Sequence, residues 1–207
     1  MLKWMLVLFM MFSVSLKAET KVLAFSGSSR DGSVNQKLVT EAAQIASKMG
    51  ATVTLVDLKD YQLPFYNADL ESSQGMPEIA KKFRRLMVQS DIILIASPEY
   101  NGSLPGELKN AIDWASRGEN GGSSREAFKG KTFVVMSASP GQGGGARGLV
   151  HLTQIIGNVG GTVLPNQVVV PNAFGAFDEQ GKLKDPTLVQ KLNDAITAAL
   201  SSTKQAA

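Results

Sequence analysis

The chain has 207 residues, of which 43% are hydrophobic and 19% charged, and its formal net charge is +3. These values suit one globular α/β domain with a full core and give little reason to expect a second domain. The chain has no cysteine, which excludes thiol catalysis, disulfides and cysteine-based metal sites. It has no basic run longer than Lys81-Lys82 or Arg84-Arg85, so nothing indicates nucleic-acid binding. We expect both basic pairs on the solvated face of a helix.

Residues 1–18 have the pattern of an export signal. A lysine precedes Met5–Val14, an almost unbroken apolar run, and small residues follow as far as Ala18. The run is about half of the ~20 residues that a membrane-spanning helix needs, but it fits the hydrophobic part of a secretory signal. The alternative is a buried first strand or helix, although residues 21–26 serve better as the first core strand. We therefore expect cleavage after Ala18, a mature domain of residues 19–207 without a stable membrane span, and a periplasmic location; an uncleaved segment would leave the protein cytoplasmic or membrane-anchored.

Beyond Ala18, strand-like and helix-like segments alternate along the chain. We expect strands at 22–25, 53–58, 92–96, 132–136 and 162–170, and helices at 35–50, 77–89, 108–115, after 145 as far as 156, and at 186–200. We expect a loop at 62–75, a flexible surface loop at 118–124 and a frayed tail at 201–207. Strands separated by helices predict an α/β fold with a doubly wound five-stranded parallel sheet of order 2-1-3-4-5, with helices on both faces.

The loop after the first strand, Gly27–Asn35, has the composition of an anion-binding site. It leads into a helix N-terminus, where free N–H groups and the helix dipole favour an anion, and Arg30 adds a charged fork suited to phosphate. The loop has neither a Gly-Lys-Ser/Thr ending nor Gly-x-Gly-x-x-Gly spacing, so a phosphate monoester fits better than a triphosphate or a pyrophosphate. The alternative is that Ser33 or Asn35 only caps the helix. The candidate residues here are Ser28, Ser29, Arg30, Ser33, Val34 and Asn35.

Two further loops are expected at the same edge of the sheet, after the third and fourth strands. Pro98 and Tyr100 offer a rigid turn and a flat face, and Glu99 and Asn101 offer polar partners to a heterocycle. The alternative for Tyr100 is a half-buried packing residue. In the loop 139–145, the glycines permit close approach of the backbone to a ligand, and a flexible surface loop is the alternative. Its candidate residues are Ser139 and Gly141, while Arg147 just beyond could contact a ligand phosphate or form a salt bridge between subunits.

Four groups of residues together resemble a known family. They are Gly27-Ser28-Ser29-Arg30 with Ser33 and Asn35, Ser97-Pro98-Glu99-Tyr100-Asn101 with Pro105, Leu108-Lys109-Asn110-Ala111 with Asp113 and Trp114, and Gly144-Gly145-Ala146-Arg147. In this order and spacing they are similar to the NADPH-dependent FMN reductase family, which includes quinone, chromate and azo-dye reductases. The resemblance covers nearly all of the chain after Ala18.

The resemblance implies a flavodoxin-like fold, bound FMN, NADPH or NADH as co-substrate, and a quinone or another small molecule as electron acceptor. Residues 28–35 would hold the phosphate and ribityl chain, residues 98–101 would line the isoalloxazine ring, and Ser139 with its glycines would close the other side. Because flavin N5 carries the hydride, no catalytic side chain and no metal is implied, and the lone His151 is expected to be structural or on the surface.

The resemblance also implies a homodimer or homotetramer, with the helix that carries Trp114 and the loop 118–124 as candidate subunit contacts. Members of the family are normally cytoplasmic, so the resemblance does not identify the physiological electron donor of an exported protein. Two other functions remain: a flavodoxin-like electron carrier that does not turn over nicotinamide, and a binding protein that has lost the flavin.

Overall fold

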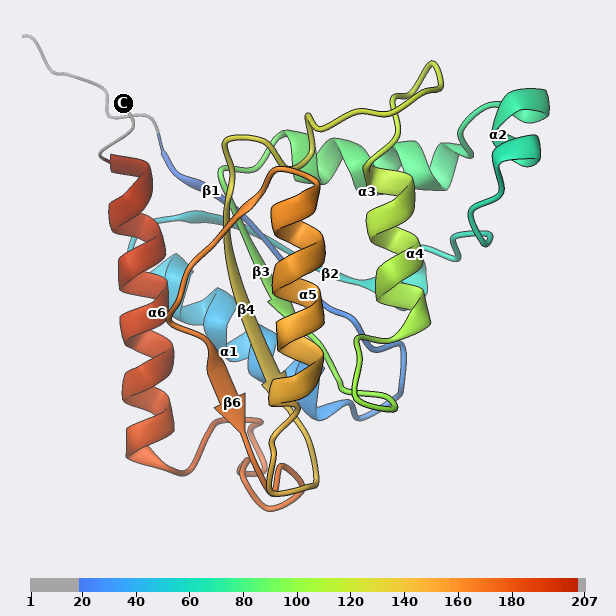
Figure 1. The fold of residues 1–207 in the computed structure, drawn as a ribbon. Helices are drawn as coiled ribbons and strands as arrows, with labels where there is room; N and C mark the ends of the chain where they lie inside the picture. The colour runs from blue at the N-terminus through green and yellow to red at the C-terminus, as the bar shows by residue number, and fades with distance from the viewer. Residues whose placement is uncertain (1–18, 205–207) are drawn as a thin grey trace, which may run out of the picture.

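A parallel β-sheet runs through the middle of the computed structural model, which describes residues 19–204 (Figure 1). The expected export signal and residues 205–207 lie outside this range. Within the described range, no helix combines the length and the apolar character needed to cross a bilayer.

The order of the strands determines which loops meet. The strands are β1 Lys21–Ser26, β2 Thr52–Asp57, β3 Ile92–Ala96, β4 Thr132–Ala138, β5 Thr162–Val163 and β6 Val168–Val170. They form one sheet of order β2-β1-β3-β4-β5, in which β6 also pairs with β4 and every pairing is parallel. Ala96 pairs with Ser26 on one side and Met136 on the other. The loops after β1, β3 and β4 therefore leave the sheet side by side, and the predicted doubly wound order is confirmed.

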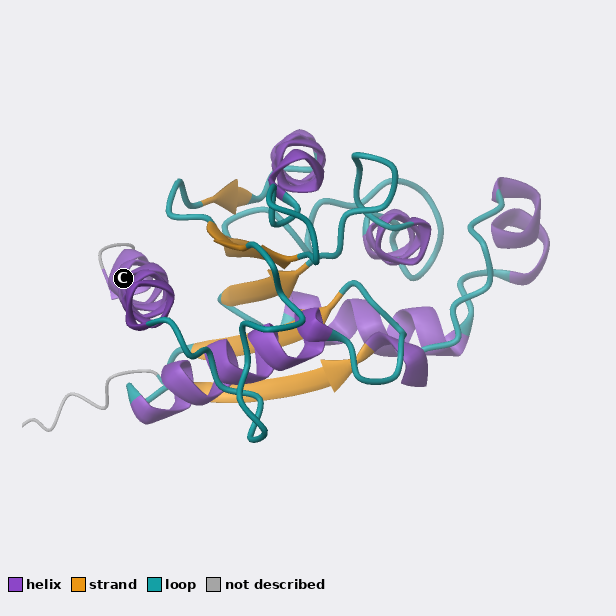
Figure 2. Cartoon of the chain, turned by 90° about the horizontal axis from the view of Figure 1, so that it is seen from below, coloured by secondary structure: helices purple, strands orange, loops and turns teal. Residues whose placement is uncertain are grey.

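Helices cover both faces of the sheet (Figures 1 and 2). Helices α1 Val34–Lys48 and α6 Pro186–Lys204 pack on one face, where Leu38 and Leu192 belong to a core of fully buried side chains. Helices α3 Glu78–Val88, α4 Gly106–Ala115 and α5 Ala146–Asn158 cover the other face, around a second core that includes Phe83. Because β1 and β3 are buried on both faces, their sequences are almost continuously apolar.

The single strand expected at 162–170 is divided into β5 and β6, so the sheet has a sixth strand. Phe133 of β4 pairs with Val163 of β5, and Met136 of β4 pairs with Val168 of β6. The second segment therefore uses five residues where β4 uses three, and the two extra residues interrupt the strand. Pro165 lies in the excess segment, where it has no N–H to donate to the sheet and its carbonyl accepts from the Gln167 N–H at 2.8 Å.

Two expected irregular segments contain helix. The loop expected at 62–75 contains α2, Ala68–Gln74, whose N-cap Asn67 accepts hydrogen bonds from the N–H groups of Asp69 and Leu70. Of the tail expected to fray, residues 201–204 continue α6. A 3₁₀ turn, η1 Leu58–Asp60, follows β2.

Trp114 is a core residue. It is fully buried within the chain, its indole Nε1–H donates to the Pro64 carbonyl at 2.7 Å, and the Tyr66 ring meets it edge-on at 5.0 Å between centroids. These contacts join the segment after β2 to α4. The side chain itself is therefore not available to a second subunit.

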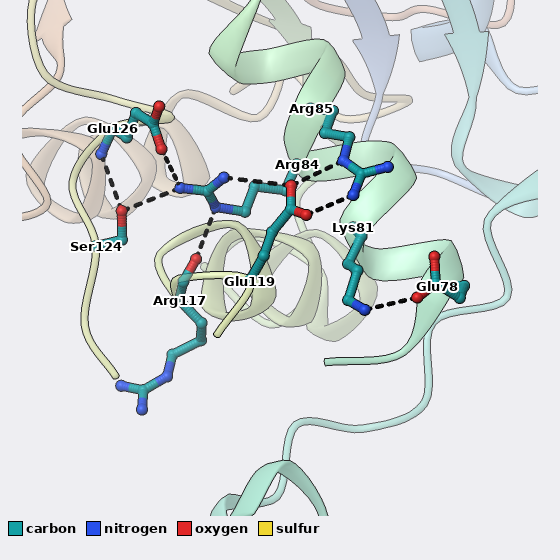
Figure 3. A network of polar contacts seen from close by, with 8 residues as sticks. All are labelled: Glu78, Lys81, Arg84, Arg85, Arg117, Glu119, Ser124 and Glu126. Carbon is teal, nitrogen blue, oxygen red and sulfur yellow. Dashed lines mark hydrogen bonds and ion pairs between the residues drawn. The ribbon is translucent and has the colours of Figure 1, made fainter. Parts of the chain in front are cut away.

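Of the pair Arg84-Arg85, expected on a solvated helix face, Arg85 is exposed but Arg84 is buried; Figure 3 shows the polar contacts of both. Only 6% of the Arg84 side chain is exposed, and its guanidinium donates to the Arg117 carbonyl at 2.7 Å, to Ser124 Oγ at 3.1 Å and to Glu126 at 2.6 Å. The neighbouring Arg85 is more exposed and donates from Nε to Glu119 at 2.8 Å. Together these bonds attach the loop 118–124 to α3.

Candidate functional site

The loop after β1 presents unpaired N–H groups at the start of α1. Ser33 is the N-cap, and its Oγ accepts from the Gln36 N–H at 3.3 Å. Elsewhere in the first turn, the N–H groups of Val34 and Asn35 have no acceptor in the part of the chain that the structure describes. A helix start of this kind, next to the Arg30 side chain, is suited to an anion. Capping by Ser33 and anion binding are thus compatible here.

Asn35 holds this helix start against β4. Its buried side-chain amide donates to the Ala138 carbonyl and accepts from the Ala138 N–H, each at 2.9 Å. The amide is therefore occupied by the protein, and the backbone N–H is the group of Asn35 that remains for a ligand. The bridge also fixes the distance between the loops after β1 and β4.

The loop after β3 forms a tight turn that exposes an aromatic ring. Tyr100 and Ser103 exchange backbone hydrogen bonds of 2.9 and 3.0 Å, and Asn101 between them has φ 53°. Asparagine tolerates this left-handed conformation better than most residues. The Tyr100 side chain is left 43% exposed beside Pro98, rather than packed in the core.

Glu99 ties this loop to the start of α5. Its carboxylate accepts from Arg147 Nη2 at 2.6 Å, from Arg147 Nε at 3.0 Å and from the Gly148 N–H at 3.1 Å. Burial of the carboxyl acts to raise its pKa, but the bonds from Arg147 and Gly148 outweigh burial and hold the pKa below its ordinary value. Arg147, expected to contact either a ligand or another subunit, is thus engaged with Glu99 of its own chain.

The glycines of the loop after β4 allow close packing against the sheet. Gly145 has φ 90°, and a Cβ on it would lie 1.9 Å from Ser137 Oγ. A Cβ on Gly144 would lie 2.4 Å from a Val169 methyl group. No side chain fits at these two positions, so packing explains Gly144 and Gly145, whereas a Cβ on Gly141 or Gly143 would meet nothing within 4 Å.

The three loops line one cavity, to which all the predicted site residues contribute except Ser29, Asn101 and Gly141. It is lined by Ser28, Arg30, Gly32, Ser33, Val34, Asn35, Pro98, Glu99, Tyr100, Ala138, Ser139, Pro140 and Phe174. Its volume is about 80 Å³, well below the ~300–1,000 Å³ of pockets that enclose a whole small ligand. The cavity can therefore enclose only part of a nucleotide-sized ligand.

The three other predicted residues have different roles. The Ser29 N–H donates to Glu107 at 3.1 Å, and Ser29 lines a neighbouring cavity of about 260 Å³. Asn101 forms the turn described above, and the Gly141 carbonyl accepts from the Asn172 N–H at 3.3 Å. His151 lies on the surface with Nδ1 2.9 Å from Ser103 Oγ. Residues 19–204 contain no cluster of three potential metal ligands.

Four lining residues were not predicted: Gly32, Ala138 and Pro140, which lie in or next to the predicted loops, and Phe174, which lies in another loop. Phe174 follows β6, and this strand was expected to be part of a single longer one. The signal that could have found it is the turn composition of Pro171-Asn172-Ala173-Phe174-Gly175, directly after a strand and therefore at the same edge of the sheet.

The lining of the cavity combines two kinds of groups. Helix N–H groups, hydroxyls and a guanidinium suit a phosphate, whereas Pro98, Tyr100 and Phe174 suit a flat ring. The one carboxylate that lines it, that of Glu99, is engaged by Arg147 and Gly148.

Comparisons with known proteins identify the family of the chain. The model of the NADPH-dependent FMN reductase family matches residues 20–175. An NAD(P)H-dependent FMN reductase of Pseudomonas aeruginosa is 38% identical over 81% of this chain and 86% of its own, and a probable NADPH:quinone oxidoreductase of Oryza sativa is 37% identical over 89% and 88%. The solved structure of FerB, a flavoenzyme NAD(P)H:(acceptor) oxidoreductase of Paracoccus denitrificans, covers 88% of this chain and 96% of its own with a TM-score of 0.73 and 30% identity. The chain belongs to the NADPH-dependent FMN reductase family, and its fold is flavodoxin-like.

Proposed function

We propose that this protein is an FMN-dependent oxidoreductase that passes hydride from NAD(P)H through the flavin to a quinone or a similar small acceptor. Membership of the family and the names of its relatives, FMN reductases and quinone oxidoreductases, support this activity. The observation that carries it to this chain is the cavity described above, where a phosphate-binding helix start and exposed aromatic rings meet.

The residues of the cavity fit FMN. Arg30, the Ser33 hydroxyl and the free N–H groups of Val34 and Asn35 would bind the phosphate, and Ser28 would contact the chain that links it to the ring. Pro98, Tyr100 and Ser139 would border the isoalloxazine. When bound, FMN supplies the hydride-accepting ring, and the protein supplies its position, its hydrogen-bond donors and an open face for the second substrate.

Glu99 has a positioning role in this proposal. Its carboxylate is held ionised by Arg147 and Gly148, so it fixes the loop beneath the ring and does not serve as a proton donor. No other carboxylate lines the cavity in the described chain, and His151 is not among the lining residues. The proposed reaction assigns no proton transfer to a side chain.

A second copy of the chain would complete the site. The enclosed volume is too small for FMN, and the side of the cavity beyond Tyr100 and Phe174 is open. We therefore propose a homodimer or homotetramer in which a neighbouring subunit borders the flavin. Light scattering after gel filtration measures the assembly, and a monomer with full FMN affinity would contradict this part of the proposal.

The N-terminal segment is proposed to be a cleaved export signal, which would place the mature protein in the periplasm. Support comes from the sequence of residues 1–18 and from the start of β1 at Lys21, only a few residues beyond Ala18. N-terminal sequencing of protein purified from its native cell compartment would identify the first residue. Recovery of intact Met1 in the cytoplasm would contradict export.

The activity is tested with purified mature protein loaded with FMN. We expect oxidation of NADPH or NADH that depends on both enzyme and quinone, and an absorbance spectrum typical of a flavoprotein. Free FMN at the same concentration and enzyme without quinone are the controls. A yellow protein with no NAD(P)H oxidation above these controls would instead support an electron carrier.

A further inference from the structure

Phe174 is an exposed aromatic residue on a firmly held turn. Its side chain is 73% exposed, whereas Ala173 beside it is fully buried and Phe177 is 9% exposed. Asn172 has φ 49°, and its carbonyl accepts from the Gly175 N–H at 3.1 Å. The turn thus buries its neighbours and directs the Phe174 side chain away from the core.

This turn is also attached to the loop after β4. The Ala173 N–H donates to the Ser139 carbonyl at 3.0 Å, the Asn172 N–H donates to the Gly141 carbonyl at 3.3 Å, and the Ser139 N–H donates to the Val170 carbonyl at 3.1 Å. The position of Phe174 is therefore set by backbone bonds to a loop of the candidate site.

The ring lies at the cavity that we assign to FMN. Phe174 lines it together with Arg30 on the loop after β1 and Ser139 on the loop after β4. Burial of a Phe side chain stabilises a folded protein, and the protein on its own does not bury this one. A ligand that covered the ring would bury it.

We propose that Phe174 packs against bound FMN as an aromatic cover that slows release of the cofactor. This inference rests on the proposed function, because it requires that FMN occupy the cavity. The predominant effect is on dissociation, since changes at an existing contact surface act mainly on the off-rate.

The first test is truncation. We expect F174A to raise the FMN dissociation constant about tenfold, mostly through a faster off-rate, as burial of one aromatic side chain would give. The melting temperature without FMN should stay unchanged, because Ala173 and Phe177 keep the turn packed. Met49 provides the control: it is 42% exposed at the opposite end of α1, roughly 20 Å from the helix start, so M49A should bind FMN like the wild type.

The second test reports proximity without turnover. An indole in contact with a flavin quenches flavin fluorescence, so FMN bound to F174W should be dimmer than FMN bound to the wild type or to M49W. The proposal is wrong if the wild type binds FMN, F174A binds it with the same affinity, and FMN bound to F174W is as bright as FMN bound to the wild type. If the wild type does not bind FMN, the proposed function itself fails.

Discussion

Arg30 is the cationic side chain among the described residues that line the candidate site. A guanidinium can form two parallel hydrogen bonds to a phosphate, and a hydrogen bond to a charged group is worth ~1.5–3 kcal/mol. We therefore expect R30A to weaken FMN binding by about 10- to 150-fold, a range that follows from this energy. The affinity of R30K for FMN should lie between those of the wild type and R30A, because the lysine ammonium keeps the charge but cannot form the two parallel hydrogen bonds.

Fluorescence titration with FMN and with riboflavin checks the role of Arg30. Riboflavin has no phosphate, so its affinity should be the same for the wild type and for R30A. Equal loss of affinity for both ligands would mean that Arg30 contacts another part of the flavin. No loss for either ligand would mean that the phosphate does not bind at Arg30.

The ion pair between Glu99 and Arg147 should make the free energy of unfolding depend on pH. Because the folded pKa of Glu99 is lowered, its contribution to stability is complete above the unfolded value near 4.5 and disappears as the pH falls through the folded pKa. The Arg147 side chain is 81% exposed, so screening by solvent should keep the contribution of the pair below ~1 kcal/mol. We expect E99Q to lower the melting temperature slightly at pH 7 and to match the wild type in strong acid.

A double-mutant cycle isolates this pair from other effects. E99Q combined with R147Q should cost little more than either change alone, as expected for two residues that act on each other. Strictly additive changes in the melting temperature would show that Glu99 acts through Gly148 and not through Arg147.

At the scale of elements, a buried ion pair joins α2 to the end of α4. Glu71 is 6% exposed at its side chain, and its carboxylate accepts from Arg117 Nη2 at 2.8 Å and from the Tyr66 hydroxyl at 3.0 Å. The Arg117 guanidinium, aided by the Tyr66 hydroxyl, holds the pKa of this carboxyl below its ordinary value against the effect of burial. The Glu71 carboxylate therefore adds a charged link between the segment after β2 and the end of α4.

We expect E71Q to lower the free energy of unfolding by about 1–3 kcal/mol, because it removes the charge that pairs with a largely buried guanidinium. Proteolysis within residues 62–75 should become faster in the folded protein. The difference in stability from the wild type should be full at pH 7 and shrink below pH 4.5 as Glu71 is protonated. E78Q is a suitable control, because Glu78 pairs with Lys81 at the surface; equal destabilisation by both changes would contradict the role of Glu71.

The elements that the sequence predicts well are those with a long, regular hydrophobic pattern. Strand β3 is apolar throughout, β1 is apolar between Lys21 and Ser26, and α1 has a clear amphipathic period, so these elements and the order of the sheet could be predicted. Helix α2 was missed because Leu70 is its one large apolar residue, although Asn67 and Gly75 are ordinary helix boundaries. The division of β5 from β6 has a local signal in Pro165, which cannot donate to a sheet, but the registers with β4 depend on pairing distant in the sequence.

The candidate site also has features that the sequence predicts and features that it does not. Local composition predicted its loops, because serines before a helix and glycines after a strand have local causes. What each side chain does there depends on partners distant in the sequence: Asn35 with Ala138, Glu99 with Arg147, and Ser29 with Glu107. The exposed ring of Phe174 likewise depends on how its turn is bonded to Ser139 and Gly141.

At the scale of the whole molecule, a ligand in the site would add to the bonds that already join its loops. The residues of the site come from the loops after β1, β3, β4 and β6, so a ligand that contacts all four binds the folded chain and not the unfolded one. At a concentration of FMN a hundredfold above the dissociation constant, this linkage adds ~2.7 kcal/mol to the free energy of unfolding. For a domain of this size we expect the melting temperature to rise by about 5–10 °C.

Riboflavin at the same concentration should raise the melting temperature much less, because it cannot use Arg30 and the helix start. R30A should bring the FMN shift part of the way toward the riboflavin shift, since it removes the guanidinium but leaves the helix start to bind the phosphate. Equal shifts with FMN and riboflavin in the wild type would mean that the loop after β1 does not bind the phosphate. The cavity would then hold the ring alone, and the anion-binding start of α1 would need another ligand.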